Sequence, residues 1–109
     1  MTRTAEELLP VLERYASSQG IELNRDREYV IDLIKGLLRN EERYGYRSCP
    51  CRLAAGAEEN DRDIICPCIY RDEDISEYGS CYCGLYVSEQ WNNKEIIQVI
   101  VPERRQARR

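Results

Sequence analysis

Apolar side chains recur at helical spacing near the start of the chain, at Leu8, Val11, Leu12 and Tyr15. Thr4 stands three residues before Glu7, which is the pattern of a capping box at a helix N-terminus. Gly20 is a residue type that commonly follows a helix. We therefore expect a helix over residues 5–18, with Pro10 either kinking it or moving its regular start by one turn.

A second and broader apolar stripe follows, made of Tyr29, Val30, Leu33, Ile34, Leu37 and Leu38. Asn24 is the expected N-cap of this helix. Asp26 and Glu28 add negative charge to the first turn, where the helix dipole favours it. The stripe ends near Tyr44 and Gly45. These two helices are expected to supply most of the aliphatic core.

After the second helix the apolar pattern breaks into short pieces, with a polar link at residues 58–63. Residues 72–78 can form one short helix ended by Gly79, and residues 88–91 can form a helical turn. Residues 95–101 are rich in β-branched side chains, so we expect them to be strand-like. The predicted fold is therefore mainly α, with N-terminal helices followed by loops and short helices.

The length and composition fit one small domain. The chain has 109 residues, of which 42% are hydrophobic and 33% charged. We place the domain at residues 1–101 and a basic tail at residues 102–109. No apolar run approaches the roughly 20 residues of a membrane span, and the acidic N-terminus lacks the pattern of a secretory signal. We therefore expect a cytoplasmic protein that does not enter a membrane.

Charge is unevenly distributed along the sequence. The net charge is −4, but the tail carries +3 and residues 1–101 carry −7. Such an acidic body is a poor match for nucleic acid, so we expect no nucleic-acid partner. The arginine-rich tail is expected to be a solvated chain end, with docking to an acidic partner as the alternative.

Histidine is absent while cysteine is abundant, with six residues. The missing histidine excludes Ser-His-Asp and Cys-His catalysis and histidine-ligated zinc or haem. The cysteines form three Cys-x-Cys pairs, separated by 14 and then 12 residues: Cys49-Pro50-Cys51, Cys66-Pro67-Cys68 and Cys81-Tyr82-Cys83. Zinc sites normally use wider pairs, whereas a stiff Cys-Pro-Cys can direct its two sulfurs to different atoms. This spacing suits an iron–sulfur cubane, which takes one thiolate for each of four irons.

A cluster of this kind would use four thiolates and leave two of the six over. Two spare thiols beside an electron carrier are a candidate redox-active disulfide, which accepts two electrons delivered singly. The alternative is that all six cysteines are buried or metal-bound structural residues. Spacing alone leaves both interpretations open.

The three tripeptides, with RYGY at residues 43–46 before them and GLYV at residues 84–87 after them, resemble a known family. The pattern is similar to the catalytic chain of ferredoxin:thioredoxin reductase. More narrowly, it resembles the single-chain ferredoxin:disulfide reductases of anaerobic archaea and bacteria. The resemblance extends from the first helix to about residue 90. It implies a small iron–sulfur domain whose second half is wrapped round a 4Fe-4S cluster.

The resemblance also assigns a role to each cysteine. It implies that the cluster ligands are Cys49, Cys66, Cys68 and Cys81. Cys51 and Cys83 would then form the active-site disulfide, with Cys51 attacking the substrate and Cys83 on the cluster side. Ferredoxin would be the electron donor, and a thioredoxin-like protein or a small disulfide would be the substrate. The implied activity is that of a ferredoxin-dependent disulfide reductase, an oxidoreductase.

Two features depart from the plant-type members of that family. The spacers between the cysteine pairs differ in length, and Tyr82 stands where those chains have a histidine that is thought to handle protons. Tyrosine has a reference pKa of about 10 and cannot titrate in the same range. Tyr82 would donate a hydrogen bond as a neutral phenol, or the proton would come from water or a carboxylate such as Glu77. Alternatively, the Tyr82 ring packs over the cluster and excludes solvent.

Arginines near the cysteine pairs are further candidates for the site. Arg47 and Arg52 flank the first pair and would either lower the pKa of Cys51 or form surface salt bridges. A ferredoxin-docking face should be basic, and its candidates are Arg39, Arg43, Arg47, Arg104 and Arg105. The rival interpretation from another class is a non-catalytic metal module, either a zinc-stabilised interaction domain or a simple electron carrier.

Overall fold

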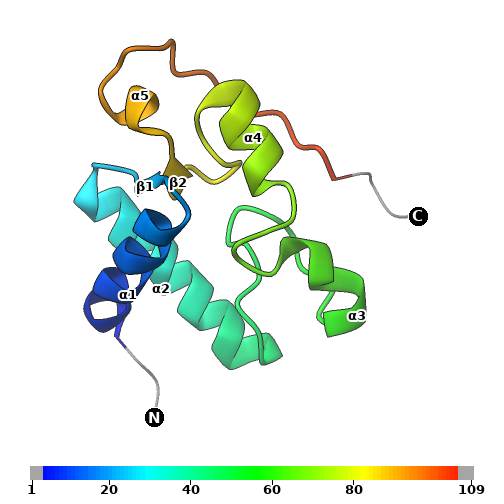
Figure 1. Cartoon of the computed structure of the whole chain (residues 1–109). Helices are drawn as coiled ribbons and strands as arrows, with labels where there is room; N and C mark the ends of the chain where they lie inside the picture. The colour runs from blue at the N-terminus through cyan, green and yellow to red at the C-terminus, as the bar shows by residue number, and fades with distance from the viewer. Residues whose placement is uncertain (1–3, 106–109) are drawn as a thin grey trace.

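The computed structural model describes residues 4–105, and about half of them are helical (Figure 1). Two long helices come first and short elements follow: α1 (Ala5–Ser18), β1 (Glu22–Leu23), α2 (Arg27–Tyr44), α3 (Glu58–Asp61), the 3₁₀ helix η1 (Arg62–Ile64), α4 (Arg71–Tyr78), β2 (Tyr86–Val87) and α5 (Glu89–Asn92). The expected helical architecture thus carries a small two-stranded sheet. Within the described residues, no helix is long and apolar enough to cross a membrane.

Helix α1 has the predicted bounds and the predicted capping box. The Glu7 backbone N–H donates to the Thr4 hydroxyl at 3.1 Å, and the Thr4 N–H donates to the Glu7 carboxylate at 3.3 Å. Pro10 lies inside the helix without interrupting it. The apolar side of α1 faces inward, with Leu8 almost completely buried.

Helix α2 starts later than the sequence predicted. Its N-cap is Asp26, whose side chain accepts from the Tyr29 N–H at 3.2 Å, so the assignment of Asn24 as N-cap is wrong. The Asn24 side chain instead accepts from the Asp26 N–H and donates to the Gly84 carbonyl, both at 3.0 Å. Asn24 therefore ties the start of α2 to the turn after the third cysteine pair. Gly45, with φ of 87°, ends the helix as predicted.

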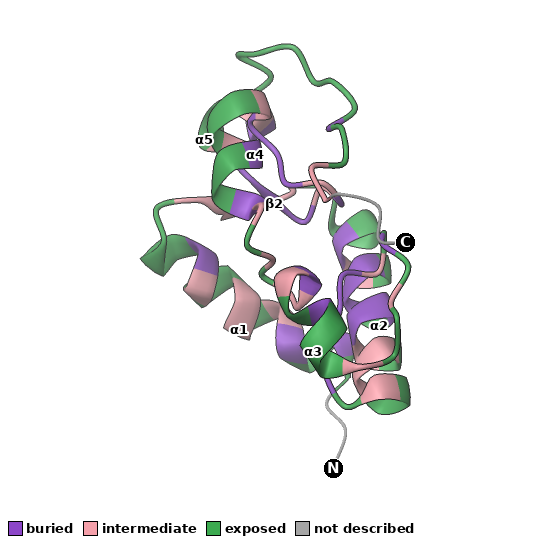
Figure 2. Ribbon diagram, turned by 90° about the vertical axis from the view of Figure 1, so that its right-hand side faces the viewer, coloured by how far each residue is buried: buried purple, intermediate pink, exposed green. Residues whose placement is uncertain are grey.

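The core lies between the two long helices and parts of the second half. Buried residues line one side of α2 and continue into the segment around β2 (Figure 2). The most deeply buried aliphatic and aromatic side chains are Leu8, Val30, Ile34, Leu37, Ile64, Leu85, Tyr86 and Val87. Half of these belong to the second half of the chain, so it contributes more to the core than the sequence pattern indicated.

The two short strands connect distant parts of the chain. Strands β1 and β2 pair antiparallel, with Glu22 opposite Val87 and Leu23 opposite Tyr86. The sequence analysis did not predict this sheet, because each strand has only two residues. The pairing holds the segment after the third cysteine pair against the connection between α1 and α2 (Figure 1).

The predicted polar link at residues 58–63 is an ordered helical segment, α3 followed by η1. Its Asp61 carboxylate is completely buried. It accepts hydrogen bonds from the Tyr46 hydroxyl and from the backbone N–H groups of Ala55 and Gly56, the last two at 3.0 and 3.1 Å. A buried carboxylate needs such partners, and here they tie the loop after the first cysteine pair to α3.

The predictions for the remaining segments are partly confirmed. Helix α4 ends at Gly79, with φ of 80°, and Ser88 caps the short helix α5. The strand predicted at residues 95–101 is wrong. This segment arches from α5 back toward α4 (Figure 1), and Ile97 and Ile100 are 84% and 96% exposed. A strand needs a partner, and within the described residues the named strands are β1 and β2 alone.

Residues 102–105 are not the solvated chain end that the sequence predicted. Arg104 forms ion pairs with Asp74, Glu73 and Glu77 of α4. Arg105 pairs with Asp63 at 2.9 Å and approaches Asp61 at 3.6 Å. The acidic body therefore binds the basic segment that follows it. The two final arginines, Arg108 and Arg109, lie outside the described residues.

Candidate redox site

Five of the six cysteines line one small cavity: Cys49, Cys66, Cys68, Cys81 and Cys83. Its other lining residues are Arg52, Pro67, Arg71, Tyr82 and Tyr86. The sixth cysteine, Cys51, is exposed and is not among the lining residues. The fold thus brings members of all three cysteine pairs together, as the sequence predicted, and leaves one cysteine residue, Cys51, exposed.

Backbone hydrogen bonds fix the first pair relative to the second. The Cys49 N–H donates to the Ile64 carbonyl at 2.7 Å, and the Cys66 N–H donates to the Arg47 carbonyl at 2.8 Å. Ser48 and Ile65 form the antiparallel bridge between these bonds. Two cysteines of the cavity, Cys49 and Cys66, therefore hold their positions through the main chain.

A glycine in α2 lets the first pair approach the helix. A Cβ atom at Gly36 would lie 2.7 Å from the Pro50 Cβ, closer than two carbon atoms can pack. Only glycine leaves room there for the proline ring of Cys-Pro-Cys. Helix α2, which carries much of the core, therefore also supports the loop that bears Cys49 and Cys51.

The third pair lies in a tight turn next to β2. The Cys81 N–H donates to the Tyr86 carbonyl at 2.9 Å, and the Gly84 N–H donates to the Cys81 carbonyl at 3.0 Å. Gly84 has φ of 80°, a conformation that glycine adopts readily. The Tyr86 N–H also donates to the Cys81 Sγ at 3.3 Å. The Cys81 sulfur is thus held by a backbone donor inside the protein.

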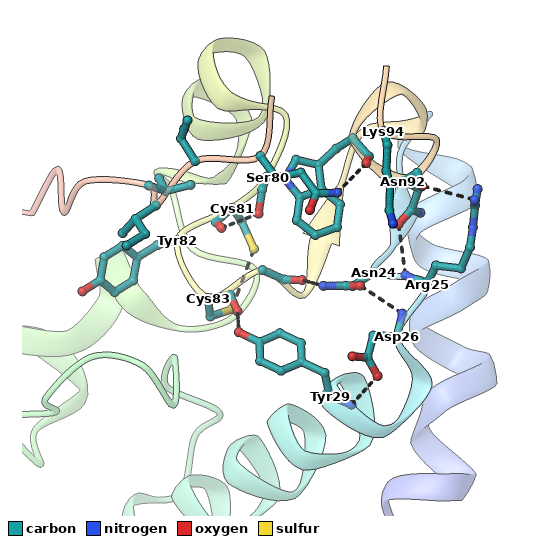
Figure 3. A pocket seen from close by; sticks show the side chains of 16 residues that line it. Asn24, Arg25, Asp26, Tyr29, Ser80, Cys81, Tyr82, Cys83, Asn92 and Lys94 are labelled. Atoms are coloured by element: carbon teal, nitrogen blue, oxygen red, sulfur yellow. Dashed lines mark hydrogen bonds between the residues drawn. The ribbon is translucent and has the colours of Figure 1, made fainter. Parts of the chain in front are cut away.

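Tyr29 of α2 contacts the same turn and was not singled out by the sequence analysis. Its hydroxyl donates to the Cys83 carbonyl at 2.5 Å (Figure 3). Its ring lies against Gly84. These residues line a groove between the start of α2 and the end of the exposed arch. Helical spacing identified Tyr29 only as part of the apolar stripe, because its partner lies 54 positions further along the chain.

Cys51 and Cys83 differ in accessibility although their thiols interact. Cys51 is exposed and Cys83 is buried, with only 6% of its surface accessible. Hydrogen bonds from the thiols of Cys49 and Cys83 lower the pKa of Cys51 well below its usual value. Hydrogen bonds with the thiols of Cys49, Cys51 and Cys81, together with burial, raise the pKa of Cys83. The more accessible thiol is therefore also the one whose thiolate is favoured.

Of the two alternatives predicted for Arg52, the surface salt bridge is wrong because the residue is buried, whereas its charge does contribute to lowering the pKa of Cys51. Its guanidinium forms two hydrogen bonds with the Glu103 carboxylate, at 2.6 and 2.8 Å. It also donates to the Cys68 Sγ at 3.4 Å and lies over the Tyr82 ring, 4.4 Å from its centroid. Burial opposes the charged form, but Glu103 and the cysteines hold the pKa of Arg52 above its ordinary value.

Tyr82 lines the cavity, and the Arg52 guanidinium lies over its ring. The carboxylate considered as an alternative proton donor, Glu77, is not among the residues that line the cavity. It is largely exposed and pairs with Arg104 at 3.2 Å. The structure thus brings Tyr82 to the cavity and leaves Glu77 outside it.

The arginines considered for docking fall into three groups. Arg104 and Arg105 are engaged in the ion pairs described above and are poor candidates. Arg47 forms a partly exposed salt bridge with Glu41 at 3.0 Å, as one of the two alternatives predicted. Arg39 and Arg43 are exposed on α2. Among the docking candidates, all of which lie within the described residues, Arg39 and Arg43 of α2 therefore remain exposed.

The chemistry of the cavity fits an anionic thiolate-ligated group. Its lining contains five cysteines and two arginines, and no aspartate or glutamate is among the residues that line it. Two buried cations would stabilise the negative charge of an iron–sulfur cluster and its four thiolates. In the described residues, no three cysteine, aspartate or glutamate side chains are already arranged to hold a single metal ion.

Comparison with known proteins identifies the family. The family model described as ferredoxin thioredoxin reductase catalytic beta chain matches residues 2–105. The chain therefore belongs to this family, whose members are oxidoreductases that act on disulfides. The comparison with curated proteins found no match.

Proposed function

We propose that this member of the ferredoxin thioredoxin reductase catalytic beta chain family is a ferredoxin-dependent disulfide reductase. The observation that carries the proposal is the distribution of the thiols. Five line a cavity suited to an anionic group, and the sixth belongs to Cys51, an exposed residue beside them. A structural metal module has no need of such an exposed cysteine.

Cys49, Cys66, Cys68 and Cys81 would hold a 4Fe-4S cluster in the cavity. When bound, the cluster would supply electrons one at a time. The protein contributes fixed positions for these sulfurs, through the main-chain bonds of Cys49 and Cys66 and the backbone donor to Cys81. Arg52 and Arg71 contribute the compensating positive charge.

Cys51 and Cys83 would carry out the thiol–disulfide exchange. The Cys51 thiolate attacks one sulfur of the substrate disulfide, the substrate S–S bond breaks, and the departing thiolate takes up a proton. The Cys83 thiolate then attacks the Cys51 sulfur, which releases the second substrate thiol and leaves a Cys51–Cys83 disulfide. Two electrons and two protons restore the pair. The exposure of Cys51 and the burial of Cys83 support this division of roles.

The proposed partners follow from the family name and from access to the site. Ferredoxin would donate electrons, and a thioredoxin-like protein or a small disulfide would approach Cys51. The exposed Arg39 and Arg43 on α2 are the remaining candidates for the face that receives an acidic ferredoxin. Tyr82 would cover the cavity, with its ring against the Arg52 guanidinium.

The test is to trap the mixed disulfide in the anaerobically purified protein. Cys83→Ser should retain a thioredoxin-like substrate as a covalent adduct on Cys51, whereas Cys51→Ser should give no adduct. An adduct that forms on Cys83 in the Cys51→Ser variant would contradict the assignment of Cys51 as the attacking thiol. A colourless protein without acid-labile sulfide would favour a zinc-stabilised module. A thiol count that does not rise by two on reduction would favour a simple electron carrier.

A further inference from the structure

Arg52 is placed differently from the other arginines of residues 4–105. Only 2% of its side chain is exposed. Its Nη1 donates to the Cys68 Sγ at 3.4 Å, and among the hydrogen bonds of residues 4–105 no other arginine donates to a cysteine sulfur. A buried cation that bonds a sulfur directly can act on any group which that sulfur binds.

The position of Arg52 depends on a residue from the far end of the chain. Glu103 accepts two hydrogen bonds from the guanidinium, through Nε and Nη2. The ring of Tyr82 and the ring of Tyr70, 5.2 Å away at its centroid, lie against the same guanidinium. A two-point ion pair fixes both the place and the orientation of an arginine. Glu103 therefore directs the remaining donor, Nη1, toward Cys68.

We infer that Arg52, held by Glu103, raises the reduction potential of the cluster through the Cys68 thiolate. The inference rests on the proposed role of Cys68 as a cluster ligand. Reduction adds negative charge to the cluster and its thiolates, so a cation and hydrogen-bond donor at a ligand sulfur stabilises the reduced form more than the oxidised form. Arg52 and Glu103 are positioning residues here, since neither takes part in the exchange of disulfides.

The sign of the effect separates this role from simple electrostatics. Glu103 carries a negative charge close to the site. If the charge alone mattered, Glu103→Gln would raise the potential, because the variant removes a negative charge. If Glu103 holds Arg52 on Cys68, Glu103→Gln lowers the potential, because Arg52 loses its anchor. The two explanations predict shifts in opposite directions.

The experiment is a redox titration of the cluster, followed by EPR, in the anaerobically purified full chain. We expect a lower potential in Arg52→Gln and in Glu103→Gln, and a smaller decrease in Arg52→Lys, which keeps the charge but not the two-point ion pair. The double variant should match Arg52→Gln, because Glu103 acts through Arg52.

Arg71→Gln is the matched control. Arg71 is also buried, lies over two tyrosine rings, Tyr15 and Tyr86, and pairs with a carboxylate, Asp72. It lines the same cavity but has no hydrogen bond with a cysteine sulfur in the described structure. Its substitution should therefore cost comparable stability and shift the potential less than Arg52→Gln does.

Several results would overturn the inference. They are an unchanged potential in Arg52→Gln, a shift no larger than that of Arg71→Gln, or a higher potential in Glu103→Gln. Should Arg52→Gln fail to fold, Arg52→Lys and Glu103→Gln decide the question. If the parent protein binds no cluster, the proposed function fails and the inference fails with it, whereas a bound cluster with unmoved potentials contradicts the inference alone.

Discussion

The two halves of the molecule are held together by different kinds of interaction. Helices α1 and α2 pack through continuous apolar faces and begin at local side-chain caps, Thr4 and Asp26. The second half has short elements joined by polar contacts between distant residues. Asp61 binds Tyr46, and Arg52 binds Glu103, 51 positions away. The two long helices thus form from a regular local pattern and support the site. The site itself depends on specific polar pairs between residues far apart in the sequence.

The largest expected effect comes from removing a predicted cluster ligand. Cys66→Ser should abolish cluster binding and loosen residues 46–105, because structure around a metal site depends on the bound group. Helices α1 and α2, which pack on each other, should keep more of their protection. Iron and acid-labile sulfide content, together with amide hydrogen exchange along the chain, would measure both effects.

Cys51→Ser is the matched control, since Cys51 is exposed and does not line the cavity. This variant should retain the cluster and the amide hydrogen-exchange pattern of the parent protein. Equal loss of protection in α1 and α2 on Cys66→Ser would mean that the two halves fold as one unit and that the contrast between them is only local.

A core truncation in α2 should destabilise the whole molecule. Ile34 has no exposed surface, so Ile34→Ala should cost about 2–5 kcal/mol in the free energy of unfolding through lost burial and a cavity. Ile100→Ala removes the same atoms from a side chain that is 96% exposed and should cost almost nothing. Denaturant unfolding of both variants gives the comparison, and similar losses would show that the exposed arch is packed in solution.

A charge removal in the polar network should have an intermediate effect. Burial would raise the pKa of Asp61, but hydrogen bonds from Tyr46, Ala55 and Gly56 lower it, so the carboxylate is charged at neutral pH. Asp61→Asn places an NH₂ group opposite these donors and should cost about 1–3 kcal/mol.

The matched control for Asp61 is Glu59→Gln, which removes the same charge from an exposed position of α3. It should change the free energy of unfolding by less than about 0.5 kcal/mol. Denaturant unfolding at neutral pH distinguishes the two variants. Equal effects would assign the loss to net charge rather than to the buried hydrogen bonds.

The smallest effect is expected at the start of α1. Thr4→Ala removes the side-chain half of the capping box and should cost about 1 kcal/mol in the free energy of unfolding. Thr4→Ser keeps the hydroxyl and should retain most of this free energy of unfolding. A full loss in Thr4→Ser as well would mean that the methyl group, and not the cap, matters.

The comparison of halves also explains what the sequence could predict. Periodicity and local caps gave the bounds of α1 and the end of α2, because these depend on neighbours in the chain. The start of α2 was misplaced because Asn24 and Asp26 are both good caps. The contact that distinguishes them, from the Asn24 side chain to the Gly84 carbonyl, joins residues far apart in the sequence. Residues 95–101 have strand composition, but composition cannot supply a pairing partner.

At the site, spacing predicted that the cysteine pairs would gather, but not how they are supported. The roles of Arg52 and Glu103 could not be read from the sequence, because nothing local indicates an ion pair across 51 positions. Two signals were available in the sequence: histidine is absent, and an arginine directly follows the first Cys-Pro-Cys. The ion pair of Arg104 with Asp74 of α4 could not be predicted for the same reason, because the two residues are 30 positions apart in the sequence.

The close approach of Gly36 and Pro50 limits how this protein can be engineered. Replacing a mid-helix glycine with alanine is a standard route to a more stable helix, worth roughly 0.5–1 kcal/mol. At position 36 the added methyl group would meet the proline ring at 2.7 Å and push the first cysteine pair off α2. A thermostabilised version of this chain must therefore leave that position alone and take its gains from the outer face of the helix.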